Sequence, residues 1–591
     1  MRAQRRLTTR RLYSLIGTLA YLVGCASSDR VVRLTAQDLR GGDVDRFGGL
    51  RVRLWEPSAS FQVKKVGNRW VLVTPEGSPF WMLGIWNITG DGRVDELGSS
   101  YTSRFLRKYG SDQAGWPQVN RRLKSWGFNT IGPYSYRMLL PTNRESPTVW
   151  PPDGTHPVKM PFVGLGPNPG ISSNLAGVCK NLWKGIDPSV FNIGSARGFP
   201  DVIDPKFVTY TNNAYATDSD LAVYKDSPYF IGYFSEDVDY LSGFATGTDF
   251  PSDPPGKEWA HLGVITLITA PTQSGFSDPK VYSKYALRDF LAAKYGTIGA
   301  LNSAWGSNYT TFDSSGGWPT GSGLLDENGR SSHRWLGNPL NPELLTGMNA
   351  QVKADLDEFL YQLAAKYFSI NRAAFKAVAP QALFLGPTSL GGAGWRSPAR
   401  GPILKAAGQY LDVVSVSTDG SPAQLDFIAH WAGDVPLIIW EGVVANPDSG
   451  RWRYTPEPAT WAVSTQEKRG QTYQRDVEAL VNGTVTGTRP YVGLLFWSWV
   501  DHSAEQKNWG LVSLLDNAYD GKEARVAAGK DPWGYPTGGE ERDYGDFISY
   551  VRNANLAVLR TLRAELAPWV HIERSDDRER IPVSPRPGRA R

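Results

Sequence analysis

The chain has 591 residues, and its composition, 41% hydrophobic and 20% charged, is that of a globular protein with one very large domain or several smaller ones. Its formal net charge is +5, but the first 24 residues contain five arginines and no acid, so the remainder is neutral. A neutral chain without a basic patch argues against nucleic acid as a partner.

The amino terminus has the pattern of an export signal. In "MRAQRRLTTRRLYSLIGTLAYLVGC" the arginines precede an apolar run that is too short to span a membrane. "LVGC" resembles the lipobox of bacterial lipoproteins, which predicts that residues 1–24 are cleaved and that Cys25 carries a lipid anchor to the membrane of the bacterial cell envelope. An ordinary signal peptide with a chance cysteine is the alternative, and Sec and twin-arginine export both stay open. If Cys25 carries the lipid, Cys179 has no partner for a disulfide.

Short apolar runs alternate with helical patterns along most of the chain. Segments with apolar residues three and four apart, such as 119–126, 355–378 and 473–481, are typical of amphipathic helices. The apolar runs that we interpret as strands are 80–86, 127–132, 158–163, 229–235, 382–386, 411–417, 435–440 and 490–498. Continuous apolar strands between such helices indicate parallel strands covered on both faces.

This alternation predicts an α/β fold, a (β/α)8 TIM barrel with long βα-loop insertions. We place the barrel at residues 61–568, after a tether or lead-in at 25–60 and before a charged, proline-rich tail at 569–591 that we expect to be disordered. The longest insertions, 164–205 and 242–350, would stand around the mouth of the barrel.

Two glutamates follow predicted strands at the point where barrel enzymes place their chemistry. Glu236 follows strand four in "IGYFSED", and Glu441 follows strand seven in "PLIIWEG". A pair of carboxyl groups suits glycosidic bond cleavage, in which one protonates the leaving oxygen and the other attacks the anomeric carbon, and retaining enzymes hold the two ~5–5.5 Å apart. A solvated acid at a strand end is the structural alternative.

Several segments resemble the β-agarase type of glycoside hydrolase. They run in the same order from about residue 66 to 525 and include "GNRWVLVTPEGSPFWMLGIW", "GFNTIG", "PYFIGYF", "PLIIWEGVVANPDSG" and "NWGLVSLLDNAYD". The resemblance implies a retaining clan A hydrolase, related to the barrel β-galactosidases, with Glu441 as nucleophile.

The strand-four motif departs from that family. There "GYF" is followed by an aliphatic residue and then Asp-Asn-Glu, and an alignment without a gap puts Val238 at the position of the acid/base. Glu236 remains the first candidate for the acid/base, with Asp237 and Asp239 as alternates.

Further candidates for sugar contacts come from the other strand ends. Each could instead have a purely structural role, in the core or as a loop cap. The candidates are Trp86, Asn87, Asn129, Asp419, Trp497, Trp499, Asp501 and His502. The resemblance puts Asp419 where the family offers Asn and Tyr.

The sequence predicts an exported, lipid-anchored glycoside hydrolase that cleaves β-glycosidic bonds in a poly- or oligosaccharide by a retaining mechanism, with β-galactosidic, agarase-like bonds among the candidates. The alternative is a catalytically impaired carbohydrate-binding surface lipoprotein on the same barrel. Because there is no HExxH, phosphate loop or G-x-S-x-G pattern, we expect no cofactor and no metal. Nothing in the pattern selects an oligomeric state.

Overall fold

The computed structural model of the chain divides into two compact units, Met1–Arg40 and Gly41–Arg591. The first unit lies outside the described residues, and with it the predicted signal segment and Cys25. The residues that the structure describes are 44–52, 54–90, 100–141, 159–167, 200–236, 282–316, 321–327, 349–390, 399–416, 422–442, 463, 466–501, 509–518 and 547–569.

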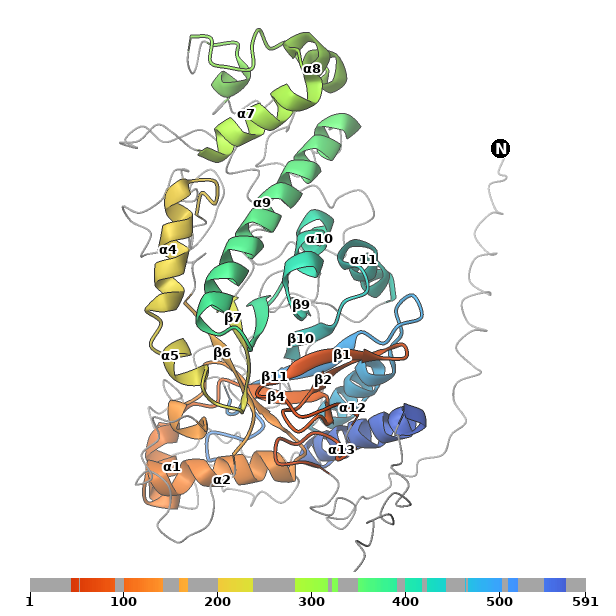
Figure 1. The fold of residues 1–591 in the computed structure, drawn as a ribbon. Helices are drawn as coiled ribbons and strands as arrows, with labels where there is room; N and C mark the ends of the chain where they lie inside the picture. Colours follow the sequence, from red (N-terminus) through yellow and green to blue (C-terminus); the bar gives the residue numbers. More distant parts are fainter. Residues whose placement is uncertain are drawn as a thin grey trace, which may run out of the picture. The chain divides into compact units, whose positions relative to one another are not determined.

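The second unit is built around an eight-stranded parallel barrel (Figure 1). Its strands are β4 (Met82–Trp86), β5 (Thr130–Ile131), β6 (Phe162–Leu165), β7 (Phe230–Glu236), β8 (Leu383–Pro387), β9 (Val414–Val416), β10 (Leu437–Gly442) and β11 (Tyr491–Trp497). They pair in the order β8-β7-β6-β5-β4-β11-β10-β9, and a parallel bridge between Leu390 and Val416 joins the two ends. Each strand overlaps one of the eight predicted runs, so the prediction of a TIM barrel is confirmed.

Helices lie between the strands in sequence and cover the barrel. They are α1 (Tyr101–Tyr109), α2 (Asp112–Ser125), α4 (Pro205–Ala216), α5 (Leu221–Tyr224), α7 (Tyr282–Tyr295), α8 (Ile298–Trp305), α9 (Ala350–Val378), α10 (Gly401–Tyr410), α11 (Pro422–Ala432), α12 (Gln466–Asn482) and α13 (Phe547–Leu566), with 3-10 turns η2 (Arg137–Leu139), η4 (Leu324–Glu327) and η6 (Ala567–Trp569). Three helices begin at capping residues. Ser100, Ser111 and Thr297 precede α1, α2 and α8, and each side chain accepts a hydrogen bond from a backbone N–H of the first turn. The longest helix, α9, packs against both α4 and α10 (Figure 1).

A small antiparallel sheet precedes the barrel. It consists of β1 (Gln62–Val66), β2 (Arg69–Val73) and β3 (Pro79–Phe80). Phe61 packs edge-on against Phe80, the last residue of β3. The ring centroid of Phe47 lies 4.7 Å from that of Tyr229, which directly precedes β7. These rings, three of them buried and that of Tyr229 partly buried, close the amino-terminal end of the barrel. Phe47 comes from the predicted lead-in, and Phe61 directly follows it.

The strands separate two apolar layers. Phe234, Trp440 and Trp497 belong to the layer inside the barrel, whereas their neighbours Tyr233, Ile439 and Phe496 belong to the layer under the helices. This alternation is what a pleated strand with two covered faces requires.

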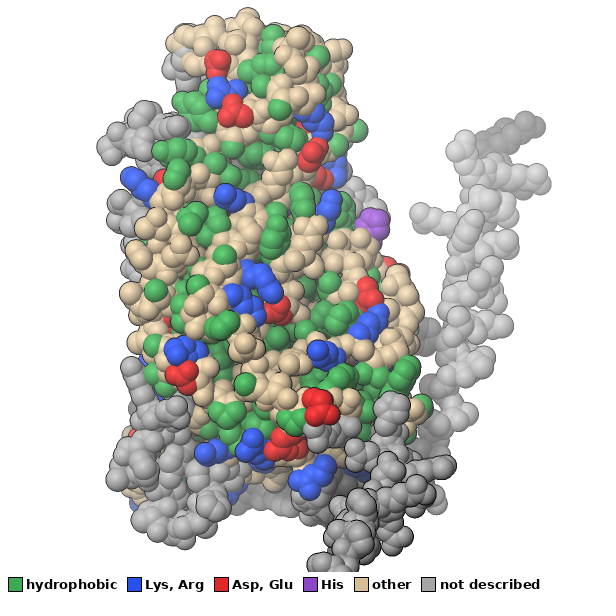
Figure 2. Space-filling model, viewed as in Figure 1, with side chains coloured by type: hydrophobic (Ala, Val, Ile, Leu, Met, Phe, Trp, Pro, Cys, Tyr) green, Lys and Arg blue, Asp and Glu red, His purple; other side chains and the backbone are tan. Residues whose placement is uncertain are grey.

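Acidic and basic side chains are interspersed on the face drawn in Figure 2, among larger areas of polar and apolar atoms. Within the described ranges, no helix combines the length and the apolarity needed to cross a membrane.

Candidate active site

Three tryptophans meet inside the barrel at the carboxyl ends of its strands. Trp86 ends β4, Trp497 ends β11, and Trp440 lies near the end of β10. The ring of Trp86 is 4.1 Å from that of Trp440 and 3.9 Å from that of Trp497. We call these three residues the tryptophan cluster.

The cluster contains buried hydrogen-bond donors. The indole Nε1 atoms of Trp86 and Trp440 are shielded from solvent, and neither has an acceptor among the described residues. A buried N–H without an acceptor costs free energy, and a ligand oxygen at the mouth would remove that cost. A ligand that offers both C–H faces to flat rings and oxygen acceptors to indole N–H groups would suit this cluster.

The predicted nucleophile stands next to this cluster in the chain. Glu441 directly follows Trp440, and β10 continues to Gly442, which pairs with Phe496 of β11. The pairing of the two strands shifts register between Ile439 and Gly442, an irregularity that changes the alternation of side chains at this strand end. The backbone therefore places Glu441 at the carboxyl end of strand seven.

Two residues of the mouth have left-handed backbones. Asn87 has φ 57° and Tyr134 has φ 58°, and the N–H of Asn87 donates to the carbonyl of Pro133, which ties the β4 end to the β5 loop. Non-glycine residues rarely adopt such angles, and they concentrate at functional sites. Asn87 is 7% exposed, and its role in binding a sugar stays a prediction.

Tyr134 and Trp440 lie at the candidate site, although sequence reasoning did not single them out. The Tyr134 ring lies 5.9 Å from that of Trp86, and the side chain is 48% exposed. The only available signal was an aromatic residue after predicted strand two. Trp440 was not singled out because it is the last residue of an apolar run and was counted as part of the strand.

The predicted acid/base, Glu236, is the last residue of β7 and is 1% exposed. Its Oε1 accepts a hydrogen bond from the hydroxyl of Tyr367 on α9. Tyr367 belongs to the layer under the helices and not to the barrel interior. The structure therefore directs the Glu236 carboxyl group toward α9, although the backbone ends at the mouth as predicted.

Asn129 lies at the other end of the barrel, so the structure does not bring it to the candidate site. Its Oδ1 accepts from the N–H of Leu83 at 2.8 Å, and its Nδ2 donates to the carbonyl of Trp81 at 2.9 Å. Both partners lie at the start of β4, so the amide group joins the amino-terminal ends of β4 and β5.

Trp499 and Asp501 are also occupied by the protein itself. Trp499 is buried under the helices, and its Nε1 donates to the hydroxyl of Tyr101 at 2.8 Å. Asp501 is 3% exposed and its Oδ1 accepts from the N–H of Gly510 at 2.9 Å. Of the strand-eight candidates, the structure thus brings Trp497 to the mouth, while Trp499 packs in the core and Asp501 caps its loop.

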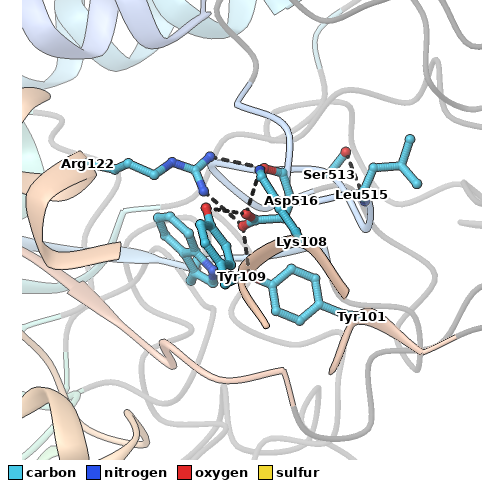
Figure 3. Close-up of polar contacts among 8 residues, drawn as sticks. Tyr101, Lys108, Tyr109, Arg122, Ser513, Leu515 and Asp516 are labelled. Carbon is cyan, nitrogen blue, oxygen red and sulfur yellow. Dashed lines mark hydrogen bonds and ion pairs between the residues drawn. The ribbon is translucent and has the colours of Figure 1, made fainter. Parts of the chain in front are cut away.

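A buried aspartate holds this loop against the first two helices (Figure 3). Asp516 accepts from the hydroxyls of Tyr101 and Tyr109 and pairs with Lys108 and Arg122, at 2.8–2.9 Å in each case. Burial by itself would raise the pKa of Asp516, but the charges of Arg122 and Lys108 outweigh it and hold the pKa below its usual value.

The remaining predicted site residues, Asp237, Asp239, Asp419 and His502, lie outside the described residues, as does Val238. In the part of the chain that is described, no three histidine, cysteine or acidic side chains gather in a way that would hold a metal ion.

Comparisons with known proteins agree with this geometry. The chain is 24% identical over 504 residues to β-agarase B of Vibrio sp. (strain JT0107), and 22% identical over 548 residues to β-agarase A of the same strain. The alignments cover 78% and 82% of this chain but 46% and 47% of the relatives, so the chain spans about half the length of the curated relatives it matches. No protein-family model matches the chain.

Solved structures show the same fold. An exo-β-agarase superimposes with a TM-score of 0.60 at 18% identity, covering 88% of this chain and 67% of that one. An agarase superimposes with a TM-score of 0.59 at 19% identity, covering 87% and 67%. The chain is thus similar to β-agarases in both sequence and fold, and the predicted resemblance is confirmed.

Proposed function

We propose that this chain, a relative of the β-agarases, is a glycoside hydrolase that cleaves β-glycosidic bonds, agarase-like β-galactosidic bonds among them, in a poly- or oligosaccharide. The observation that carries the proposal is the position of Glu441 at the carboxyl end of β10, directly after Trp440 of the tryptophan cluster. The aromatic rings would stack on sugar faces, while the indole N–H groups and the Asn87 amide would bind hydroxyl oxygens.

The proposed reaction is a retaining double displacement. The Glu441 carboxylate attacks the anomeric carbon and forms a glycosyl ester, while the C–O bond to the leaving group breaks and the leaving oxygen takes a proton from an acid. The same acid, now a base, then removes a proton from water, and the water oxygen displaces Glu441. The sequence offers three candidates for that acid, which are Glu236, Asp237 and Asp239.

A second candidate function is carbohydrate binding without efficient turnover. The observation that favours it is the hydrogen bond from Tyr367 to Glu236, which engages the predicted acid/base away from the tryptophan cluster. A barrel that keeps the nucleophile and the sugar-binding rings but lacks the acid would bind the same ligands.

The experiment uses the purified full-length chain with agarose oligosaccharides and with activated aryl β-glycosides, the galactoside included. We expect turnover, and a glycosyl adduct on Glu441 detected by mass spectrometry. Glu441→Gln should abolish both. Glu467→Gln, an exposed glutamate on α12, is the matched control and should behave as the parent chain. Saturable binding of oligosaccharide without turnover or adduct would favour the binding protein.

We further propose, from the sequence alone, that the chain is exported and lipid-anchored at Cys25 in the bacterial cell envelope. Expression in a bacterial host with labelled palmitate should label the parent chain and leave Cys25→Ser unlabelled and soluble. Equal labelling of the two would contradict the anchor.

A further inference from the structure

The carboxyl group at the end of β7 is built into the layer beneath the helices. Tyr367, its hydrogen-bond donor, is fully buried, and its ring stacks on Phe207 of α4 with centroids 6.0 Å apart. The pairing of β7 with β8 shifts register between Phe234 and Glu236. Because of this irregularity, Glu236 does not follow Phe234 into the barrel interior, as strict alternation would require.

Other buried polar groups surround this pair. Asn371 of α9 donates to the carbonyl of Tyr367 at 2.9 Å and accepts a hydrogen bond from the hydroxyl of Tyr215 on α4 at 3.4 Å. Burial raises the pKa of Tyr215 well above its ordinary value, and the charge of Glu236 raises it further. The Tyr215 phenol therefore stays protonated, and Glu236 lies in a buried polar cluster made by β7, α4 and α9.

A general acid/base must reach both the leaving oxygen and a water molecule in each catalytic cycle. Glu236 is 1% exposed and held by a buried phenol on the helix side of the strand. Its backbone is fixed as well, because its carbonyl accepts from the N–H of Thr388 at 2.9 Å. The residue thus joins β7 to β8 through its main chain and to α9 through its side chain.

We propose that Glu236 is a positioning residue, which with Tyr367 anchors the carboxyl end of β7 to α9, and that a different group donates the proton. The proposal rests on the proposed function, since positioning has meaning only if the barrel catalyses. Its consequence is that the first acid of "SEDVD" fixes the strand end from which the catalytic acid must project.

Three substitutions separate positioning from proton transfer. Glu236→Gln keeps an acceptor oxygen for the Tyr367 hydroxyl but cannot donate a carboxyl proton. Tyr367→Phe removes only the hydroxyl, and Glu236→Leu removes the acceptor. Tyr361→Phe on the same helix, whose exposed hydroxyl binds Gln409 at 2.8 Å, is the matched control.

If Glu236 positions the strand, Glu236→Gln should retain kcat within about tenfold, because a hydrogen-bond acceptor remains. Tyr367→Phe and Glu236→Leu should each lower kcat by more than about tenfold with KM unchanged, for activated and unactivated leaving groups alike. Added azide should not restore the kcat that Tyr367→Phe and Glu236→Leu lose. In Glu236→Gln, kcat should still fall at alkaline pH as in the parent chain, because another group is the acid. All measurements are made well below the melting temperature of each variant.

The opposite order of effects would overturn the inference. A catalytic Glu236 predicts that Glu236→Gln loses about 10²–10⁴-fold with poor leaving groups, keeps activity on activated aryl glycosides and recovers with azide. Wild-type kcat in Tyr367→Phe would also overturn it, even if Glu236→Leu failed to fold. A wild-type chain without turnover would instead overturn the proposed function, and would be seen before any variant was compared.

Discussion

The Asp516 side chain illustrates how one buried charge holds two distant parts of the molecule together. It is fully buried, whereas its partners Arg122 and Lys108 are 20% and 26% exposed. Asp516 itself has a left-handed backbone, φ 61°, in the loop that follows β11. Removing one partner of such a buried pair leaves the other charges uncompensated, which is far more costly than the loss of a surface pair.

We expect Asp516→Asn to lower the free energy of unfolding by about 3–5 kcal/mol at neutral pH, since Arg122 and Lys108 would lose their counter-charge. Urea denaturation followed by tryptophan fluorescence measures this. Asp289→Asn, which breaks an exposed pair with Arg288, is the control and should change stability by less than about 1 kcal/mol. Equal effects of the two substitutions would contradict the buried-pair account.

The exposed ring of Tyr134 gives a prediction about binding. If it stacks on a sugar beside Trp86, Tyr134→Ala should weaken oligosaccharide binding by about fivefold, the equivalent of about 1 kcal/mol, with little change in thermal stability. Calorimetric titration with an oligosaccharide checks it. Tyr285→Ala, an exposed tyrosine on α7, should bind as the parent chain does, and an unchanged affinity in Tyr134→Ala would remove that ring from the site.

Among the elements, α10 and α11 approach each other through a glycine. A Cβ atom on Gly408 of α10 would lie 2.1 Å from the carbonyl oxygen of Ala432, the last residue of α11. The backbone of one helix thus packs directly on the backbone of the next. By contrast, a Cβ atom on Gly299 of α8 would meet nothing within 4 Å.

The same substitution should therefore have opposite signs at the two helices. Gly408→Ala is expected to destabilise by about 1–3 kcal/mol because the helices must move apart. Gly299→Ala should stabilise by up to about 1 kcal/mol, since alanine has the higher helix propensity and open space receives its methyl group. Thermal unfolding of both variants tests this. A higher melting temperature in Gly408→Ala would show that α10 and α11 leave room for a methyl group at this position.

For the whole molecule, buried and partly buried aspartates link folding to pH. Burial works against ionisation in Asp355, Asp412 and Asp516, yet hydrogen bonds and neighbouring cations hold the pKa of each below its ordinary value. A carboxyl group with a depressed folded-state pKa contributes stability above its unfolded-state pKa, and that contribution is lost as the pH falls through the folded-state value. Asp201 acts in the opposite direction, because burial raises its pKa despite hydrogen bonds from Ser283.

We therefore expect the free energy of unfolding to be nearly constant from neutral pH down to about pH 5 and to fall below about pH 4, where the three aspartates begin to bind protons in the unfolded chain. Denaturant midpoints across this range measure it. The difference between the parent chain and Asp516→Asn should shrink at the acidic end. Stability that rises toward pH 3 would contradict the assigned directions.

The sequence by itself determined the barrel, because eight apolar runs separated by helical patterns allow few other arrangements. It also placed Glu236 and Glu441 at strand ends, since a polar residue directly after a buried run marks the point where the strand leaves the core. Those features depend on neighbours in the chain, and local spacing carries them. The resemblance to the β-agarases was visible in the sequence because it is carried by short segments in a shared order.

Only the tertiary structure decided which way the side chains at those ends face. A register shift turned Glu236 toward Tyr367, a partner 131 positions away, and the amide of Asn129 was used by β4 at the opposite end of the barrel. Trp440 and Tyr134 joined Trp86 because strand closure brought their ends together. Contacts between residues far apart in sequence and shifts of one residue in strand register leave no periodic trace in the chain, so these assignments required the fold.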